Sequence, residues 1–230
     1  MPLKGIAETA RTLSYYTRLQ HVVANNLANA NTDAFKADRM TAHLLAGSES
    51  LIPVQETDFQ QGALRETGRP LDLALDGLGF LVVQTENGER LTRSGSLRLD
   101  QVGQVIDSLG APVLGQEGPI VLTGNSVEVL HDGSVLLDGA VVDRLRIETV
   151  SDPSTLLKEG HGRFVPAGAT EPVAVEQVRV HQGSVEEANL DPILSMVDLV
   201  RIQRAYTANV DVLKAMDDVL GSITKDVGTV

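Results

Sequence analysis

The stretch NNLANANTDAFK, from Asn25 to Lys36, closes a long helical pattern at the N-terminus of this 230-residue chain. Four of its twelve residues are asparagines, whose side chains both donate and accept hydrogen bonds and suit a helix end or a turn. Upstream, residues 4–31 show apolar positions at alternating spacings of three and four, which predicts a long amphipathic helix. The repeating positions are Ile6, Thr9, Leu13, Tyr16, Gln20, Val23, Leu27 and Ala30.

The C-terminus carries the same spacing, in a predicted helix over residues 189–226. Asn189, Asp191 and Pro192 mark its start with a capping side chain, an early negative charge and a proline that the first turn tolerates. Because both ends share one period, we expect them to pair as a coiled coil. The polar Asn209 in this seam is interpreted as fixing register and not as a ligand. The repeating positions are Leu199, Ile202, Tyr206, Asn209, Leu213, Met216, Leu220, Ile223 and Val227.

A second apolar stripe runs beside this C-terminal seam. It widens the apolar face beyond what one partner helix needs, which predicts contacts with other copies of the chain. The alternative is burial against the chain's own β-rich region. The stripe consists of Ala205, Ala208, Val212, Ala215 and Val219.

The region between the helices reads as β structure. Residues 80–83 and 90–92 flank Asn87-Gly88, a dipeptide that strongly predicts a hairpin turn. Residues 127–130 and 135–137 flank a second turn. Such short, closely spaced strands are typical of a small barrel or sandwich, whereas 37–55 and 151–172 read as connectors or exposed loops.

The predicted fold class is therefore α+β, with paired terminal helices and a central all-β domain. Its predicted parts are an N-terminal helix within 1–36, a connector with extended segments over 37–69, a β domain over 70–182 and a C-terminal helix within 183–230.

Composition excludes several classes of function. A net charge of -12 without clustered Lys or Arg argues against a nucleic-acid partner. The absence of cysteine rules out disulfides, thiolate metal sites and thiol nucleophiles. Polar residues interrupt the N-terminal helix too often for a signal peptide, and no stretch is apolar enough to suggest a membrane span.

No constellation of residues indicates catalysis, a metal or a cofactor. The five histidines are scattered without ligand spacing, and the Asp-Gly pairs lack the alternating ligands of a calcium loop. Gly77-Leu78-Gly79 lacks the third glycine of a dinucleotide loop. We therefore expect a protein that is not an enzyme.

The residues resemble the bacterial flagellar rod and hook axial proteins over nearly the whole chain. The N-terminal part of the resemblance lies in Asn25–Asn29 and Phe35-Lys36. The middle part lies in residues 62–64, 67–68, 70–77, 79–80, 92–96, 109–110 and 113–115. The C-terminal part lies in residues 182–186, 189–190, 196–197, 203–206 and Asn209.

The resemblance implies a structural subunit of the flagellar basal-body rod in the periplasm, exported unfolded by the flagellar type III apparatus without a cleaved signal peptide. Its implied partners are copies of itself and other rod subunits, and its implied role is to stack into a tube through its terminal helices. The short connector and modest length favour a proximal-rod subunit over a distal one. The alternatives are a hook-type subunit and a coiled-coil stalk presenting a β domain to a glycan surface; a peptidoglycan hydrolase lacks any supporting residues.

Two features of the Asn-rich stretch stay open from sequence. In one interpretation Asn29, Asn31 and Thr32 cap the end of the helix. In the other, the asparagine side chains form a latch of hydrogen bonds between neighbouring subunits. Ala34 stands where the family commonly has Gly, and Leu81 where a second Phe is common. If position 34 needs a positive φ, alanine costs about 1 kcal/mol there.

The residues expected at the assembly interface are Leu13, Tyr16, Val23, Asn26, Leu27, Asn29, Phe35, Leu199, Ile202, Tyr206, Asn209, Leu213, Met216 and Leu220.

Overall fold

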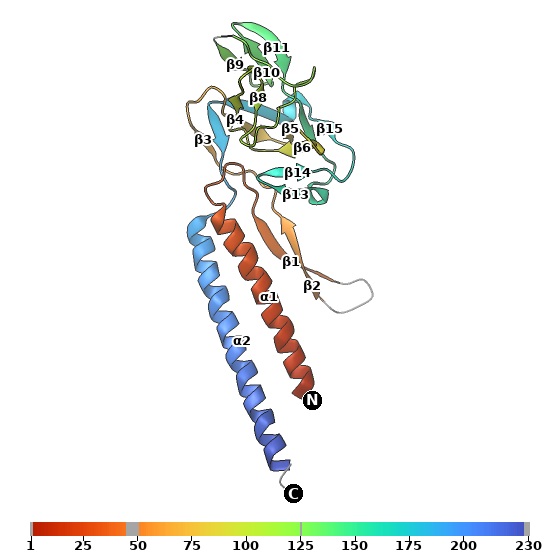
Figure 1. The fold of residues 1–230 in the computed structure, drawn as a ribbon, viewed down its shortest axis with the longest axis vertical. Coiled ribbons are helices and arrows are strands. Elements are labelled where there is room, and N and C mark those ends of the chain that lie inside the picture. Colours follow the sequence, from red (N-terminus) through yellow and green to blue (C-terminus); the bar gives the residue numbers. More distant parts are fainter. Residues whose placement is uncertain (1, 45–50, 125, 228–230) are drawn as a thin grey trace. The chain divides into compact units, whose positions relative to one another are not determined.

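The computed structural model of the protein describes residues 2–44, 51–124 and 126–227 (Figure 1). The chain forms two compact units. The helical unit comprises Met1–Ala30, Asp38–Glu56 and Asp191–Val230, and the β unit comprises Asn31–Ala37 and Thr57–Leu190. Among the described residues, no helix has both the length and the apolar character that crossing a bilayer requires.

The helical unit holds α1 (Pro2–Ala28) and α2 (Pro192–Val227), which lie side by side and run in opposite directions (Figure 1). Both helices were predicted from their spacing. The first ends earlier than expected because the chain tightens after Ala28: the Asn29 amide bonds to the carbonyl of Asn26 at 3.1 Å as well as to that of Asn25. The second begins later, at Pro192, because the Asp191 carboxylate accepts the amide of Ile193 at 2.8 Å.

A two-stranded sheet completes the helical unit, with β1 (Asp38–Leu44) and β2 (Leu51–Thr57). These two stretches are extended, as expected for segments of the 37–69 connector, whereas the expectation of exposed loops there is wrong. Pro53 lies within β2, which is possible because proline is compatible with an edge strand and each strand of a two-stranded sheet is an edge. Residues 45–50 of this stretch lie outside the described residues.

The β unit is built around a six-stranded antiparallel sheet in the order β13-β14-β6-β5-β12-β15. Its strands are β5 (Phe80–Thr85), β6 (Gly88–Thr92), β12 (Ile147–Thr149), β13 (Leu157–Gly160), β14 (Arg163–Val165) and β15 (Glu171–Pro172). The prediction of loops over 151–172 is therefore wrong for three short strands. Their sequence is rich in Gly and Pro. The partners of β14 and β15, which are β6 and β12, lie farther away in the chain, and β13 pairs with β14.

The remaining strands form smaller sheets around this one. A three-stranded sheet has the order β11-β10-β9, and three pairs are β16-β4, β17-β3 and β7-β8. Their bounds are β3 (Leu64–Glu66), β4 (Leu73–Gly77), β7 (Arg98–Leu99), β8 (Val105–Ile106), β9 (Val127–Val129), β10 (Ser134–Leu137), β11 (Ala140–Arg144), β16 (Val178–Gln182) and β17 (Ser184–Glu186). Two 3-10 turns, Pro153–Thr155 and Val175–Gln177, complete the unit.

Both predicted hairpins are confirmed. In the first hairpin, β5 pairs with β6, with Leu81 opposite Thr92 at one end and Thr85 opposite Gly88 at the other. In the second, β9 pairs with β10. Of the predicted alternatives, barrel or sandwich, the barrel is wrong, because the described strands form separate open sheets and none of these closes on itself. The largest sheet ends at β15, a two-residue strand containing Pro172, which has no amide to donate to a further strand.

Alternation along β5 divides the core of the β unit in two. Leu81 and Val83 belong to a large aliphatic cluster that also contains Leu75, Val113 and Val180. Phe80 and Val82 point to the opposite face, into a second cluster. In that cluster the rings of Phe59, Phe80 and Phe164 lie 5.2–6.0 Å apart.

Candidate assembly interface

The predicted seams are mostly half-buried, and on α1 the most buried residues, Val22 and Asn26, each precede a seam residue by one position. On α1, Leu13, Tyr16, Val23 and Leu27 are half-buried, between exposed neighbours such as Ala24. On α2, Leu199, Tyr206, Leu213 and Met216 are half-buried and Ile202 is buried. The side chain of Leu220 lies outside the described residues. Most of the seam thus stays partly accessible when one α1 and one α2 pack together.

Asn209 is satisfied within its own helix. Its side-chain amide donates to the carbonyl of Ala205 at 2.8 Å, one turn earlier. Such a bond lets the helix keep a polar residue in the seam without a partner from elsewhere.

The second stripe of α2 is largely exposed. Ala208, Val212, Ala215 and Val219 are exposed and Ala205 is half-buried, with Val212 at 47%. The start of α2 carries a further exposed group of Ile193, Leu194, Met196, Val197 and Val200, and Ile193 is 72% exposed. Several exposed apolar side chains on one helix are typical of a surface that meets a partner.

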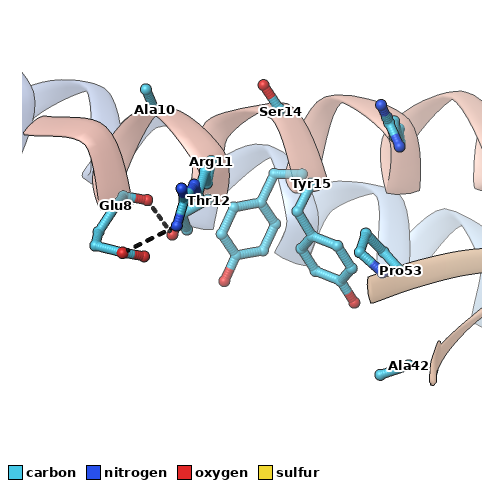
Figure 2. A pocket seen from close by; sticks show the side chains of 10 residues that line it. Glu8, Ala10, Arg11, Thr12, Ser14, Tyr15, Ala42 and Pro53 are labelled. Atoms are coloured by element: carbon cyan, nitrogen blue, oxygen red, sulfur yellow. Dashed lines mark hydrogen bonds and ion pairs between the residues drawn. The ribbon is translucent and has the colours of Figure 1, made fainter. Parts of the chain in front are cut away.

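A groove lies between α1 and the β1–β2 hairpin, with a volume of about 790 Å³. Figure 2 shows Glu8 and Tyr15 projecting from α1 to the side on which Ala42 and Pro53 of the hairpin lie. The rings of Tyr15 and Tyr16 meet edge to face at 5.6 Å. The charged residues of the lining are Glu8, Arg11 and Arg18, and the others are Ala10, Thr12, Ser14, Tyr15, Tyr16, Ala42 and Pro53.

Asn26 ties α1 to the start of β1. Its side chain donates to the carbonyl of Asp38 at 2.7 Å and accepts the amide of Asp38 at 2.9 Å. The residue is 8% exposed. This amide is therefore engaged inside the chain and positions the hairpin that forms one wall of the groove.

Asn29 acts at the end of α1, where its side chain donates to the carbonyl of Asn25 at 2.9 Å. Five residues later the structure places Ala34 in the left-handed region, with φ 56. Its amide donates to the carbonyl of Glu186 at 2.7 Å, which anchors the left-handed turn within the β unit.

Phe35 and Lys36, which follow this turn, belong to the interior of the β unit. The ammonium of Lys158 lies 4.8 Å from the centre of the Phe35 ring. Lys36 donates to Glu186 at 2.5 Å and to the carbonyl of Gln60 at 2.7 Å. Phe35, expected at an interface, is thus largely enclosed by its own unit, at 9% exposure.

Sequence reasoning missed the buried charge cluster formed by Lys36, Arg93 and Glu186. Arg93 donates to Glu186 at 3.0 Å and to the carbonyls of Gly77 and Gly79. Glu186 also accepts the amide of Gly62 at 2.9 Å. Burial lowers the pKa of Lys36 and of Arg93, while their bonds to Glu186 oppose the shift.

Asn189 was predicted to cap the C-terminal helix, but its side chain has another role in the structure. Its side chain accepts the amide of Ala37 at 2.7 Å and donates to the carbonyls of Asp58 and Gln60. It therefore joins three segments of the β unit, while Asp191 caps α2. The sequence around Asn189, shortly before the start of α2, does not indicate these distant partners.

Among the described residues, no group of three or more His, Asp or Glu side chains is arranged to hold a metal ion. His131 and His181 meet edge to face, with ring centres 5.6 Å apart. The Nε2 atom of His181 is buried without a hydrogen bond in the described chain and lies 3.7 Å from a carboxylate oxygen of Asp76.

Three family models match successive parts of the chain. Residues 12–36 match the model described as flagella basal body rod protein, residues 74–137 the D1 domain of flagellar hook protein FlgE/F/G, and residues 181–226 the C-terminal part of flagellar basal body rod FlgEFG protein. The matches thus include most of α1 with the residues that follow it, the part of the β unit from β4 to β10, and most of α2.

The flagellar basal-body rod protein FlgF of Caulobacter vibrioides is 35% identical over 212 residues, covering 86% of this chain and 85% of the relative. The FlgF proteins of Rhizobium meliloti and Escherichia coli are each 31% identical, over 91% and 88% of this chain and 90% and 89% of their own. The chain belongs to the flagellar basal-body rod protein family and is FlgF-like.

Proposed function

We propose that this structural rod subunit of the flagellar basal body assembles through its terminal helices. Each α1–α2 pair would act as a two-stranded coiled coil, and the exposed faces of the pair would join neighbouring copies and other rod subunits. The single observation that carries the proposal is the apolar outer face of α2, which has no cover among the described residues at positions such as Ile193 and Val212. Burying such faces favours association.

The proposal assigns a separate role to each part of the chain. Segments 1–36 and 183–230 build the axial core, 37–69 connects, and 70–182 forms a β domain whose buried clusters give it stability of its own. The interface uses the seam residues from Leu13 to Leu27 and from Leu199 to Leu220. Asn26 and Asn29 contribute by shaping the end of α1, and Phe35 by anchoring the chain that follows.

Location and partners follow from the same proposal. The subunit would reach the periplasmic rod through the flagellar type III export machinery, without a cleaved signal peptide, and would act neither as an enzyme nor as a nucleic-acid binder. The net charge of -12 supports the last point, because a polyanionic partner would be repelled.

Circular dichroism combined with sedimentation tests the assembly. Because each terminal helix buries only part of its apolar surface in one chain, we expect helical content and sedimenting mass to rise together with concentration. A chain that is fully helical at both ends when dilute, and still monomeric at high concentration, would contradict the proposal.

A further inference from the structure

We propose that the groove between α1 and the β1–β2 hairpin receives the second stripe of α2 from another copy of this chain. The stripe is Ala205, Ala208, Val212, Ala215 and Val219, and the groove is that of Figure 2. This inference rests on the proposed assembly and specifies which two surfaces meet.

The geometry of α2 leaves the stripe available while the helix contacts its own α1. Each stripe residue precedes a seam residue by one position, as Val212 precedes Leu213. One position corresponds to about 100° around a helix, so the stripe lies beside the seam and points in a different direction. The side chain of Met216, a seam residue, comes near Gly5 of α1, where an added Cβ would lie 3.7 Å from its methyl carbon. The same α2 therefore uses its seam for its own α1 and offers its stripe elsewhere.

The shapes of the two surfaces suit each other. Three of the five stripe residues are alanines, which let a helix approach closely. The groove offers an exposed aromatic edge at Tyr15 and small residues at Ala10, Ser14 and Ala42. A narrow row of small aliphatic side chains fits a groove with one aromatic wall better than large side chains would.

The charges also match. The groove lining carries two arginines and one glutamate, and Glu8 pairs with Arg11 at 3.2 Å. Arg18 has no ion-pair partner in the part of the chain that the structure describes. Beside the stripe, residues 211–218 contain three aspartates and one lysine. Asp211 pairs with Lys214, whereas Asp218 has no ion pair among the described residues. A second copy would place Asp218 near Arg18, and complementary charges favour that register over others.

Disulfide cross-linking tests the contact in a chain that has no native cysteine. One tagged copy carries Ala42→Cys in the groove, and a differently tagged copy carries Ala215→Cys in the stripe. Since each chain has one cysteine, every disulfide joins two copies, and it forms only where the two Cα atoms come within about 7 Å. The matched control replaces Ala215→Cys by Asp217→Cys, which is about 200° away around the helix.

Charge reversal supplies the second arm. Arg18→Asp should lower the yield of the cross-link about tenfold, and Asp218→Arg in the other copy should restore it. Circular dichroism of each variant at low concentration confirms that the fold is kept.

The outcomes separate the two proposals. A cross-link specific to position 215 that follows the charges supports the inference. Assembly by sedimentation without that cross-link, or equal cross-linking at position 217, would overturn it while leaving assembly intact. If no assembly occurs at all, the proposed function fails as well.

Discussion

Ala34 stands in a backbone conformation that most residues avoid. Its φ of 56 lies in the left-handed region, where a Cβ crowds the following carbonyl at a cost of about 1–2 kcal/mol. The position is held because the Ala34 amide reaches Glu186 and because the next two residues are buried in the β unit. Its strain is therefore offset by contacts that the turn makes possible.

Replacing Ala34 by Gly should raise the free energy of unfolding by about 0.5–1 kcal/mol, because glycine adopts this φ without strain. Urea denaturation of the purified chain measures it. Ala37→Gly is the matched control, since the φ of Ala37 is not positive and glycine there should lower stability. A loss of stability in Ala34→Gly would mean that its buried methyl group matters more than its φ.

Glu186 is the only carboxylate bonded to both Lys36 and Arg93 among the described residues, and all three are buried. Glu186→Gln leaves two buried positive charges without a counterion, so we expect a loss of about 3–5 kcal/mol in the free energy of unfolding. The control is Glu187→Gln, which removes the exposed pair with Arg65 and should cost less than about 1 kcal/mol. Equal effects of the two changes in urea denaturation would contradict this account of the cluster.

At the scale of elements, sequence patterns predicted what is local. The spacing of Leu199 to Met216 predicted α2, and Asn87-Gly88 predicted the β5–β6 hairpin, because both depend on neighbours within a few residues. The strand β14 was missed because its pairing with β6 joins residues about seventy positions apart, and β13 pairs in turn with β14. The Lys36–Glu186 pair spans 150 positions, and nothing local marks either residue as buried.

The Asn26 side chain holds the start of β1 against α1 through two hydrogen bonds to Asp38, and Asn26→Ala removes both. The change leaves the amide and carbonyl of Asp38 without these two bonds, at a cost of about 1–3 kcal/mol. Hydrogen exchange at the Asp38 amide should speed up, whereas the exposed control Asn25→Ala should leave it unchanged. If Asn26→Ala instead reduced assembly with no change in exchange or melting, a latch between subunits would be the better reading.

The turn between β9 and β10 depends on the charge of Asp132. The amide of Ser134, its hydroxyl and the guanidinium of Arg144 all donate to this carboxylate and lower its pKa. A lowered pKa in the folded state gives stability that is present above the unfolded pKa, about 3.9, and is lost as pH falls through the folded pKa. Asp132→Asn should therefore lower the free energy of unfolding at pH 7. The difference in this free energy between the variant and the unmodified chain, measured by urea titration, should narrow below about pH 4. A difference that stays constant down to about pH 2.5 would contradict the assignment.

At the scale of the whole molecule, the two units differ in how completely each buries its apolar residues. The β unit buries two apolar clusters and satisfies its buried charges internally. The helical unit leaves much of its apolar surface exposed on α2. A unit that completes its core only with neighbours is what an assembling subunit requires. The spacing of apolar residues in the sequence predicted the second stripe of α2. It did not predict the groove, because the groove depends on the β1–β2 hairpin, which was predicted to be a connector.

Recovery of the chain in purified basal bodies tests the central claim most directly. Val212→Asp combined with Ala215→Asp places two charges on the outer face of α2, and the control places the same charges at the exposed positions Gln203 and Thr207, away from the stripe. Since both variants keep the seam, we predict equal melting of the isolated chains. In cells lacking the natural chain, we predict that only the control enters basal bodies and restores motility. Normal incorporation of the stripe variant would contradict assembly through α2.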